Sequence, residues 1–378
     1  MKAKGVRNRC RLRDIPAGMP HLTAVPRMRR YMEVSAEVYR TYLGFVSPED
    51  TWPYSVDECF LDATPYLGLY GTSTRTLAKR LMTAVRERTG VAATAGIGPN
   101  MFLAKVALDV TAKHACDGIG VLDEEAFRKE VWFHRPITDI WGIGPGTARR
   151  LAGRGIFDLA GVCAERPQAI RAMFGRNGEY LLDHAWGLEP ATIADCRSYV
   201  PRARSLSNGQ VLMRDYGFAE ARTVVREMVY ESCLDLARGM LACDAVGVWV
   251  GYSGSALSGW DGAGEPPAAW AGGQRRLGRA SASERLIADA VMGLFDARVS
   301  HDVPIRRVQV ALAGVVPDRM GTLTLFDDPQ AEELERRLAE TAVAVRRRFG
   351  PNALLRATSL MPGANARERN LRVGGHRA

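Results

Sequence analysis

The spacing of apolar residues in the first third of the chain predicts alternating helices and strands. Between residues 31 and 45, apolar side chains recur at helical spacing, which predicts a helix with one face in a core. Residues 51–62 are rich in aromatic and β-branched side chains, which is typical of two short strands or one bent strand. A helix over 72–88, a strand over 91–97 and a helix from 101 to about 111 are expected to follow. This alternation indicates an α/β or α+β unit.

The remaining pattern divides into a helical part and a mixed part. Residues 122–190 combine short helical segments with Gly-containing turns, so we expect them to be wholly helical. A polar, Arg-bearing linker occupies 195–204. Beyond it, strands are expected at 205–213, 244–253, 274–281 and 304–315, with helices at 218–239 and 283–297. That order is βαββαβ, a two-layer domain with one free sheet face, and the low-complexity segment 254–273 is expected to be a loop.

The last expected strand carries two kinds of side chain. Val308, Val310 and Leu312 face one way, while Arg307 and Gln309 face the other. An open sheet face with Arg and Gln suits a phosphate backbone, although a merely solvated face has the same pattern.

Composition narrows the class of protein. The chain has 378 residues, of which 47% are hydrophobic and 25% charged, and this excludes a collagen, a disulfide scaffold and a membrane bundle. Its net charge is +9, with two basic ends and an acidic span from 31 to 345. The distribution indicates contact with a polyanion at particular places, or Arg-rich ends that are only solvated tails.

The cysteines and the apolar runs indicate in which cellular compartment the protein is expected. The seven cysteines form no CxxC pair, so we expect neither a zinc site nor a redox pair. No apolar run is long enough to span a bilayer, and no apolar stretch follows the charged start as in a secretory signal. We therefore expect a cytoplasmic protein with reduced thiols and no membrane partner.

Asp57 and Glu58 are adjacent carboxylates in an apolar, aromatic segment between Tyr54 and Phe60. Two such carboxylates are costly unless a cation joins them, and divalent cations are the usual solution. Neighbours on a regular strand face opposite ways, so both reach one metal cluster only if the chain bends. The alternative is an ordinary turn at a surface hairpin.

The sequence GIGPGTA at 142–148 lies between two helical stretches. Gly142 and Gly144 allow a tight turn, and Pro145 is well placed to open a helix. A helix N-terminus aimed outward suits a DNA phosphate, so the segment predicts phosphate contact, with an ordinary helix connection as the alternative. GIGPN at 96–100 lacks the third glycine and the acidic ribose ligand of a dinucleotide-binding fingerprint, and it is expected to be a strand-to-helix turn.

Lys105, Asp109 and Lys113 lie on or just beyond the helix expected to start at residue 101. A lysine that faces two carboxylates suits a triphosphate bridging metal ions, whereas a solvated lysine is the commoner case.

Four segments carry a resemblance to a known family: YSVDECFLDAT, GIGPNMFLAKVALDVTAKHACDGI, WGIGPGTARRLAGRGI and SLSNGQVLMRDY. From about residue 3 to 350 the chain resembles the Y-family translesion DNA polymerases, and their UmuC-like bacterial branch most closely. The resemblance implies an α+β, multidomain fold with partial palm and fingers, a helical thumb with a helix-hairpin-helix, and a βαββαβ little finger. The implied boundaries are 1–30 for a remnant of the fingers, 31–121 for an incomplete palm, 122–194 for the thumb, 195–204 for a linker, 205–350 for the little finger and 351–378 for a basic tail.

The resemblance also implies roles for individual residues. Asp57 and Glu58 are similar to the second and third catalytic carboxylates, which hold two Mg²⁺ ions. Lys113 is similar to the lysine that contacts the incoming dNTP, but one extra residue separates it from Asp109, so Lys105 remains a rival. The implied contacts to primer–template DNA are Gly142, Gly144, Gly146 and Thr147 of the thumb turn, Arg202 and Arg204 of the linker, and Arg307 of the little finger.

The sequence TLTLF at 322–326 is similar to the pentapeptide by which such polymerases dock on a sliding clamp. Leu323, Leu325 and Phe326 are its apolar residues. Thr replaces the usual leading Gln, so a simple strand end is the alternative. Other SOS and repair proteins are further partners that the resemblance implies.

One part of the family pattern is absent. The family's first metal-binding Asp and its aromatic steric gate lie upstream of the matched segments, and Asp14 is too close to Asp57 to substitute. We therefore expect a sequence recorded without its first few dozen residues, whose activity depends on the missing ligand. The alternatives are a catalytically silent DNA-binding or clamp-binding accessory on the same fold, and a plain helix-hairpin-helix protein whose carboxylate pair is structural.

Overall fold

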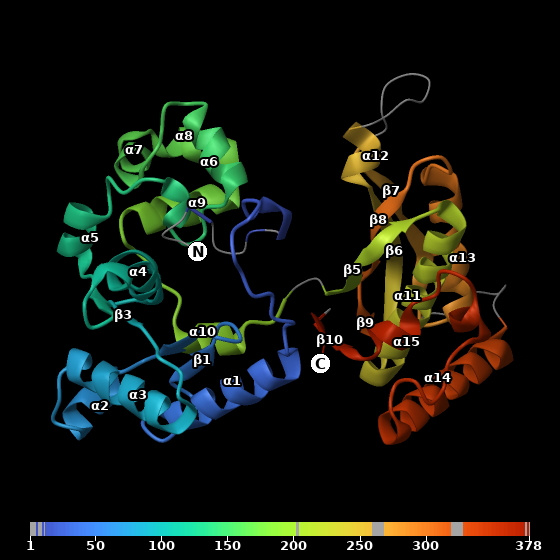
Figure 1. Ribbon diagram of the computed structural model, residues 1–378, viewed down its shortest axis with the longest axis horizontal. Helices are drawn as coiled ribbons and strands as arrows, with labels where there is room; N and C mark the ends of the chain where they lie inside the picture. Colours follow the sequence, from blue (N-terminus) through green and yellow to red (C-terminus); the bar gives the residue numbers. More distant parts are fainter. Residues whose placement is uncertain are drawn as a thin grey trace. The chain divides into compact units, whose positions relative to one another are not determined.

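The computed structural model describes residues 5–6, 10, 12–201, 204–258, 268–318, 328–374 and 376–377. The chain forms two compact units (Figure 1). Arg30–Val200 is called the hairpin unit, and Met1–Arg29 together with Pro201–Ala378 is called the sheet unit. The division falls inside the expected linker, but the linker is shorter than expected. Helix α10 (Ile193–Ser198) takes up its first residues because Thr192 and Asp195 form a capping box that starts a helix there.

The first part of the hairpin unit alternates short strands with helices. Its strands form two separate pairs, β1 with β2 antiparallel and β3 with β4 parallel. The elements are α1 (Met28–Tyr42), β1 (Thr51–Pro53), β2 (Cys59–Leu61), α2 (Thr64–Leu69), α3 (Thr74–Thr89), β3 (Ala95–Ile97), α4 (Met101–Val106), the π-helical turn η3 (Ala107–Thr111), the 3-10 turn η4 (Ala112–His114) and β4 (Ile119–Val121).

Helix α1 buries most of its expected apolar stripe in part. Tyr31 at its start is 44% exposed, whereas Val34 and Val38 are half-buried. Thr41 is the buried residue of α1, and Val46 is buried just beyond its end. The stripe therefore lies against the unit except at its first residue.

The strand pair β3–β4 packs closely on α4 because two of its residues lack a side chain. A Cβ on Gly96 would lie 2.0 Å from the carbonyl oxygen of Ala104, and one on Gly120 would lie 2.4 Å from that of Ala107. Asn100 caps α4 by accepting the amide of Leu103 at 2.8 Å. GIGPN is thus a strand-to-helix turn, as expected.

The rest of the hairpin unit is helical, and it shares one core with α4. Phe102 and Leu103 of α4 are fully buried together with Phe127, Leu151 and other apolar side chains of the later helices. The later elements are α5 (Glu124–Glu130), the 3-10 turn η5 (Ile137–Asp139), α6 (Pro145–Ala152), α7 (Leu159–Ala164), α8 (Pro167–Phe174) and α9 (Arg176–Ala185).

The sheet unit contains one antiparallel sheet with strand order β5-β8-β6-β7. Helices α11 and α13 pack on one face of it, and side chains such as Val248, Val310 and Phe295 are fully buried between the layers. The main elements follow in the expected order, β5 (Ser205–Tyr216), α11 (Phe218–Gly239), β6 (Leu241–Tyr252), β7 (Trp270–Ser281), α13 (Glu284–Arg298) and β8 (Ile305–Ala313). Strand β7 starts within the expected loop, and so does the short helix α12 (Gly254–Ser258), while β9 (Val316–Pro317) pairs with the start of β6.

The C-terminal segment, including the part implied to be a basic tail, contacts the rest of the sheet unit. Helix α14 (Pro329–Phe349) packs on α11, where Arg346 bonds to Glu231 at 2.9 Å. Beyond it, the buried carboxylate of Glu227 accepts the backbone amides of Asn365 at 2.9 Å and Ala366 at 3.2 Å. A buried carboxylate needs donors, and here the start of α15 (Ala366–Arg369) supplies them. The short strands β10 (Arg372–Val373) and β11 (His376–Arg377) follow.

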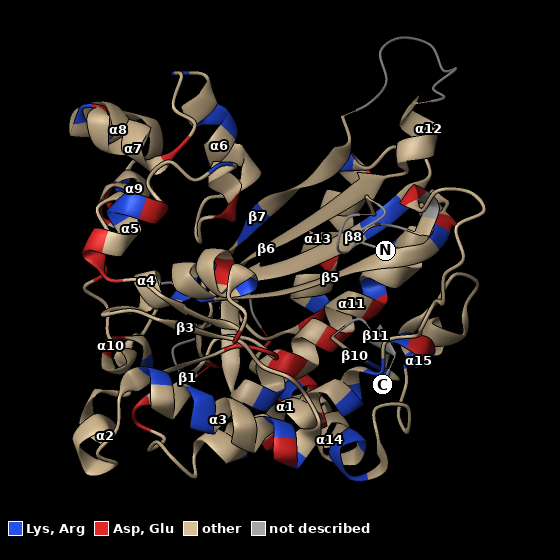
Figure 2. Cartoon of the chain, turned by 60° about the vertical axis from the view of Figure 1, so that its left-hand side comes forward, with Lys and Arg blue, Asp and Glu red and all other residues tan. Residues whose placement is uncertain are grey.

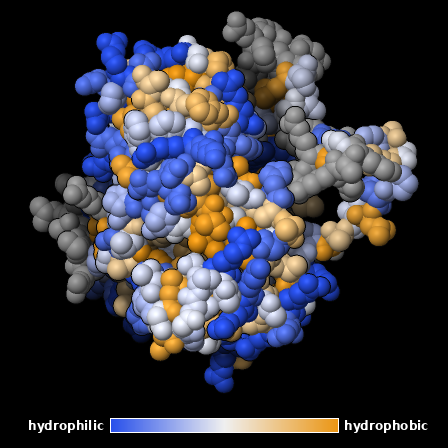
Figure 3. All heavy atoms as spheres, turned by 90° about the vertical axis from the view of Figure 1, so that its left-hand side faces the viewer, coloured by the Kyte–Doolittle hydropathy of each residue, from blue (hydrophilic) through white to orange (hydrophobic). Residues whose placement is uncertain are grey.

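The apolar side chains of the two cores are largely covered by polar residues at the surface. In Figure 3 the face turned to the viewer is mainly hydrophilic, and hydrophobic residues reach it in separate groups. Within the described ranges, no helix combines the length and hydropathy needed to cross a membrane.

Candidate active site

The carboxylate pair lies at the tip of the β1–β2 hairpin. The register pairs Pro53 with Cys59, so residues 54–58 form the turn. The backbone amides of Tyr54 and Ser55 both donate to the carbonyl oxygen of Glu58, at 3.0 and 3.1 Å. The pair therefore lies in a hairpin turn between two short strands, which is the alternative that the sequence left open, and the chain bends there, as the metal hypothesis also requires.

Asp57 is presented outward from this turn. Its Oδ1 accepts the hydroxyl of Ser55 at 2.7 Å, and the residue is exposed. A carboxylate held by a single local hydrogen bond keeps most of its lone pairs for another ligand.

Glu58 is bonded to a buried lysine that comes from α4. Lys105 Nζ donates to Glu58 Oε1 at 3.1 Å and to Asp109 Oδ2 at 2.8 Å. Only 7% of Lys105 is exposed, so it is not the solvated lysine that is the commoner case. Burial alone lowers the pKa of Lys105, but its hydrogen bonds to Asp109 and Glu58 outweigh burial and raise that pKa above the ordinary value. Lys105 is therefore a permanent cation between two carboxylates.

Lys113 differs from Lys105 in exposure. Its side chain is 66% exposed, and its Nζ lies 3.9 Å from Asp109 Oδ1. The π-helical turn η3 carries Asp109, and in it the amide of Ala112 reaches back five residues to the carbonyl of Ala107. A π turn holds one more residue than an α turn, so it changes the angle around the helix axis between α4 and Lys113. The structure thus brings Glu58, Lys105, Asp109 and Lys113 into one chain of ionic contacts.

An aromatic contact joins the carboxylate hairpin to the GIGPG turn. Trp141 Nε1 donates to the hydroxyl of Tyr54 at 2.9 Å, and the two rings meet edge to face with centroids 5.7 Å apart. Phe60 of β2 packs against both rings. Our sequence reasoning missed Trp141, although a tryptophan directly before the glycine turn was the available signal.

A second missed residue supports the hairpin from α10. Arg197 Nη2 donates to the carbonyl of Thr51 at 2.9 Å and also to that of Pro48. Arg197 lies in the segment that was expected to be a linker near DNA. It binds the backbone of the hairpin instead, because the capped helix α10 places it there.

The GIGPG turn opens α6 as expected. Gly142 has a φ of 86°, a left-handed conformation that favours glycine, and Gly144 is the N-cap. A Cβ on Gly142, Gly144 or Gly146 would meet no atom within 4 Å, so the backbone there is open. The first amides of α6, including those of Gly146 and Thr147, have no partner within the helix.

The other expected site residues lie in the sheet unit or outside the described part. Arg204 is exposed, and its carbonyl accepts the amide of Val315 at 3.0 Å. Arg307 is exposed on the open sheet face. Arg202 and the clamp-binding residues Leu323, Leu325 and Phe326 lie outside the described residues.

Comparison with known proteins identifies the family. The impB/mucB/samB family matches residues 1–109, and the C-terminal domain of that family matches residues 203–325. The chain is 30% identical over 384 residues to DNA polymerase IV 2 of Bacillus subtilis, covering 99% of this chain and 87% of that relative. The chain belongs to the Y-family of translesion DNA polymerases.

Two further Y-family proteins are similar to it. DNA polymerase IV of Pelotomaculum thermopropionicum is 28% identical over 370 residues, which cover 97% of this chain and 86% of that relative. A solved Y-family DNA polymerase chimera matches with a TM-score of 0.54 and 17% identity, covering 77% of each chain. At that identity the likeness shows a shared Y-family fold.

The donor set of the hairpin tip fits the divalent metal that Y-family polymerases imply. Mg²⁺ takes hard oxygen ligands and is commonly held by one or two carboxylates together with substrate phosphates and water. Asp57 and Glu58 supply two adjacent carboxylates on a bent, accessible turn. Among the described residues, no group of three His, Cys, Asp or Glu side chains is placed to hold a metal by itself. The tip therefore fits a metal that arrives with a nucleotide better than a preformed protein cage.

The neighbouring thiol takes no part in this chemistry. Burial raises the pKa of Cys59, directly after Glu58, to about 12. Cys59 is thus a neutral thiol at physiological pH, as expected of the cysteines in this chain.

Proposed function

We propose that this chain catalyses template-directed DNA synthesis past damaged bases, by transfer of a nucleotide from dNTP to a primer end. The observation that carries the proposal is the ionic chain Glu58–Lys105–Asp109–Lys113 behind an exposed Asp57, in a member of the Y-family. Carboxylates and lysines in one place are the charges that phosphoryl transfer needs.

Asp57 and Glu58 would hold Mg²⁺, with two ions expected. When bound there, Mg²⁺ lowers the pKa of the primer hydroxyl and takes up charge on the leaving pyrophosphate. Asp57 contributes oxygens that are open to solvent. Lys105 bonds Oε1 of Glu58 and thereby fixes the direction of that carboxylate.

Lys113 would contact the triphosphate. Its ammonium is mostly exposed and is only loosely held by Asp109 at 3.9 Å, so it can turn toward an anion without breaking a buried pair. Lys105, the rival candidate, would have to leave two carboxylates to do so. We therefore assign Lys113 to the dNTP and Lys105 to the support of Glu58.

The DNA contacts would be made to the sugar–phosphate backbone. The open amides at the start of α6, near Gly144 and Thr147, suit a phosphate of the duplex. Arg204, Arg307 and Arg202 are the expected cationic contacts in the linker and little finger. Backbone contact carries no base information, which suits a template that contains damaged bases.

The proposal also includes protein partners. We propose that Leu323, Leu325 and Phe326 dock on a sliding clamp, and that the enzyme works in the cytoplasm with other SOS and repair proteins. The family membership and the sequence TLTLF support these assignments.

A second candidate is a catalytically silent DNA-binding accessory on the same fold. It is favoured by the ion pair that Glu58 already makes with Lys105 and by the lack of a third acidic ligand in the described residues. The two candidates differ in whether the purified chain extends a primer.

Primer extension on undamaged and lesion-containing templates tests the proposal. We expect extension with Mg²⁺ that falls by at least about a hundredfold in Asp57→Ala, because metal ligands supply several kcal/mol of transition-state stabilisation. Glu87→Gln is the matched control, since Glu87 is an exposed acid on α3, and it should extend normally. Equal extension by Asp57→Ala and the parent chain would overturn the role of Asp57. No extension by any variant, with DNA binding intact, would favour the accessory.

A further inference from the structure

Two tryptophans lie on the open face of the sheet unit, on the side away from α11 and α13. Core side chains such as Val248 and Val310 face the helices, so the alternate positions face outward. Trp249 of β6 and Trp270 of β7 occupy two of these outward positions. Trp270 is 48% exposed, and Trp249 is partly exposed.

Each indole lies over a glycine of the sheet. Trp270 pairs with Gly251, where a Cβ would lie 3.2 Å from ring atom Cη2 of Trp270. A Cβ on Gly247 would lie 2.4 Å from Cη2 of Trp249. Only glycine leaves room for the rings to lie this close to the backbone.

The two tryptophans lie on the neighbouring strands β6 and β7. Trp249 pairs with Gly272 and Trp270 pairs with Gly251, so the tryptophans are diagonal partners. Their rings lie over different glycines, that of Trp249 over Gly247 and that of Trp270 over Gly251. These glycines are four residues apart on β6, or about 14 Å at the rise of an antiparallel strand, so the pair offers two aromatic surfaces along the strand.

The two rings lie near cationic and polar side chains. The guanidinium carbon of Arg307 lies 5.8 Å from the ring centroid of Trp270, and Arg276, six residues beyond Trp270 on β7, pairs with Ala245. Gln309 pairs with Trp249. Other outward positions of the four strands hold small, polar or apolar residues, namely Ser205, Ser207, Gly209, Val211, Ala245, Gln274, Ala311 and Ala313. The end of β5 carries one exposed acid, Asp215, which pairs with Arg306 at 3.3 Å. In Figure 2 the strands of this sheet are correspondingly mostly tan.

We propose that Trp249 and Trp270 form a stacking site for unpaired bases of single-stranded DNA. Bases in a duplex are stacked on one another, whereas those of a single strand are free to stack on aromatic side chains. Flat aromatic groups next to Arg on an open sheet are a combination used for single strands, and a face that only met duplex phosphates would gain nothing from indoles. The proposal goes beyond primer extension and has its own readout, so either can fail without the other.

The test compares binding of the full chain to two labelled probes, an oligothymidylate of about 12 nucleotides and a blunt duplex of about 12 base pairs. We expect Trp270→Ala to weaken single-strand binding at least about fivefold and duplex binding less than about twofold, since base stacking on an aromatic ring contributes mainly to the single strand. Trp270→Phe should restore most of the single-strand affinity because it keeps an aromatic face. The single strand should also quench the tryptophan fluorescence of the parent chain.

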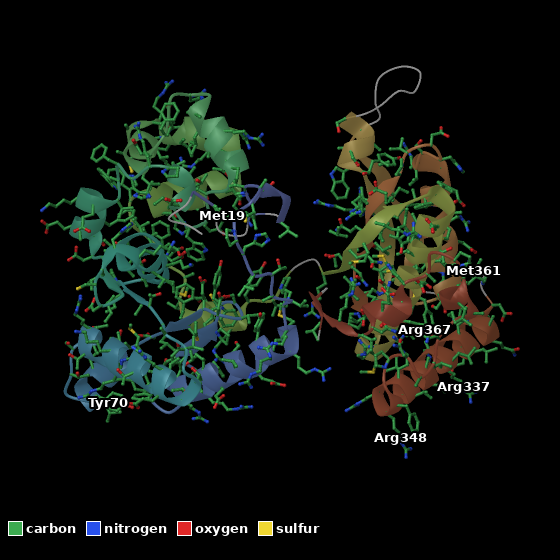
Figure 4. All side chains as sticks on the ribbon, viewed as in Figure 1. Met19, Tyr70, Arg337, Arg348, Met361 and Arg367 are labelled. Carbon is green, nitrogen blue, oxygen red and sulfur yellow. The ribbon has the colours of Figure 1, made fainter. Side chains whose placement is uncertain are left out.

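Phe349→Ala is the matched control. Phe349 is another exposed aromatic residue next to an arginine, with Arg348 at 5.2 Å from its ring, but it ends α14 on the helical side of the unit. Figure 4 shows Arg348 and Arg337 extending from this helix. Phe349→Ala should bind both probes as the parent does. An equal loss for the two probes in Trp270→Ala, or no loss for either, would overturn the proposal, and so would failure of Trp270→Phe to restore binding.

Discussion

The two units of this polymerase differ in the length and organisation of their strands. The sheet unit has strands of 9 to 12 residues in one sheet over one continuous apolar core. The hairpin unit has strands of only three residues, in two separate pairs, and its candidate catalytic residues lie in the β1–β2 turn and on α4 and the helical turns that follow it. The carboxylate tip is held by Lys105, Tyr54, Trp141 and Arg197 rather than by a sheet.

The difference bears on the roles proposed for the two units. A continuous core gives a surface of fixed shape, which suits contact with a regular DNA backbone. A short hairpin held by a few polar and aromatic contacts opens at low cost, and functional loops are commonly drawn from such low-stability parts. We infer that the sheet unit supplies a stable platform and that the hairpin unit supplies a site able to adjust.

The largest expected effect is on the core of the sheet unit. Phe295 is fully buried there, so Phe295→Ala should lower the free energy of unfolding of that unit by about 3–5 kcal/mol through lost burial and a cavity. Urea denaturation followed by circular dichroism measures it. The unfolding transition of the hairpin unit should stay in place, and a shift of both transitions by the same amount would contradict the independence of the two cores.

A smaller loss is expected when the buried cation of the site is removed. Lys105→Met leaves Glu58 and Asp109 facing each other without their shared donor. Because hydrogen bonds to charged groups contribute about 1.5–3 kcal/mol, the hairpin unit should lose about that much. Thermal denaturation measures the loss, and Lys105→Arg should retain most of the stability. If Lys105→Met unfolds like the parent, the lysine does not hold the hairpin.

The aromatic latch should contribute less again. Tyr54→Phe keeps the ring but removes the acceptor of the Trp141 N–H, so a loss of about 1 kcal/mol is expected. Hydrogen exchange of the amides of the hairpin tip measures local opening directly. Tyr66→Phe is an informative comparison, since Tyr66 also bonds through its hydroxyl, to Asp50 at 2.7 Å, but away from Trp141. Faster exchange at the tip in both variants alike would argue against a specific latch.

The smallest effect concerns acid stability of the hairpin unit. Burial alone raises the pKa of Asp158, but the hydrogen bond from Arg135 at 2.6 Å and the amide of Gly161 outweigh it, so the pKa lies below its ordinary value of 3.8. A depressed carboxyl pKa stabilises the folded state above pH 3.8, and this contribution is lost as the pH falls through the folded-state pKa.

Asp158→Asn keeps the helix cap but not the charge, and it tests that contribution. At neutral pH the variant should be less stable than the parent by under about 1 kcal/mol, because Arg135 is largely exposed. The difference should shrink as the pH is lowered below 3.8. A difference that stays constant with pH would show that the charge of Asp158 is not its cause.

Local sequence signals were sufficient for much of the fold. The alternation of Val308, Val310 and Leu312 with Arg307 and Gln309 depends only on strand geometry, and the structure buries the first three. Gly144 and Pro145 predict a helix start because glycine is accepted at the N-cap and proline is favoured at the first helical position, where the structure places them.

Contacts between distant segments left no local signal. Tyr54 and Trp141 are 87 positions apart, and nothing in either neighbourhood indicates the bond between them. The burial of Lys105 depends on two carboxylates reaching it, one from a separate hairpin. In the segment beyond residue 350, for which the resemblance implied a basic tail, the backbone amides of Asn365 and Ala366 donate to the buried Glu227, and no local pattern indicated this contact.

The π turn at Ala107–Thr111 determines the direction in which the side chains directly after it, including Lys113, point around the helix axis. Each residue of a helix advances the chain by about 100° around the axis, so one extra residue turns every later side chain by that angle relative to α4. Lys113 thus takes its direction from the length of the turn as much as from its own identity. Deletion of a single residue there would swing the lysine to another side of the helix while leaving the carboxylate hairpin intact. Insertions and deletions in this turn therefore offer evolution a way to re-aim one charge of the site without altering the residues that carry the others.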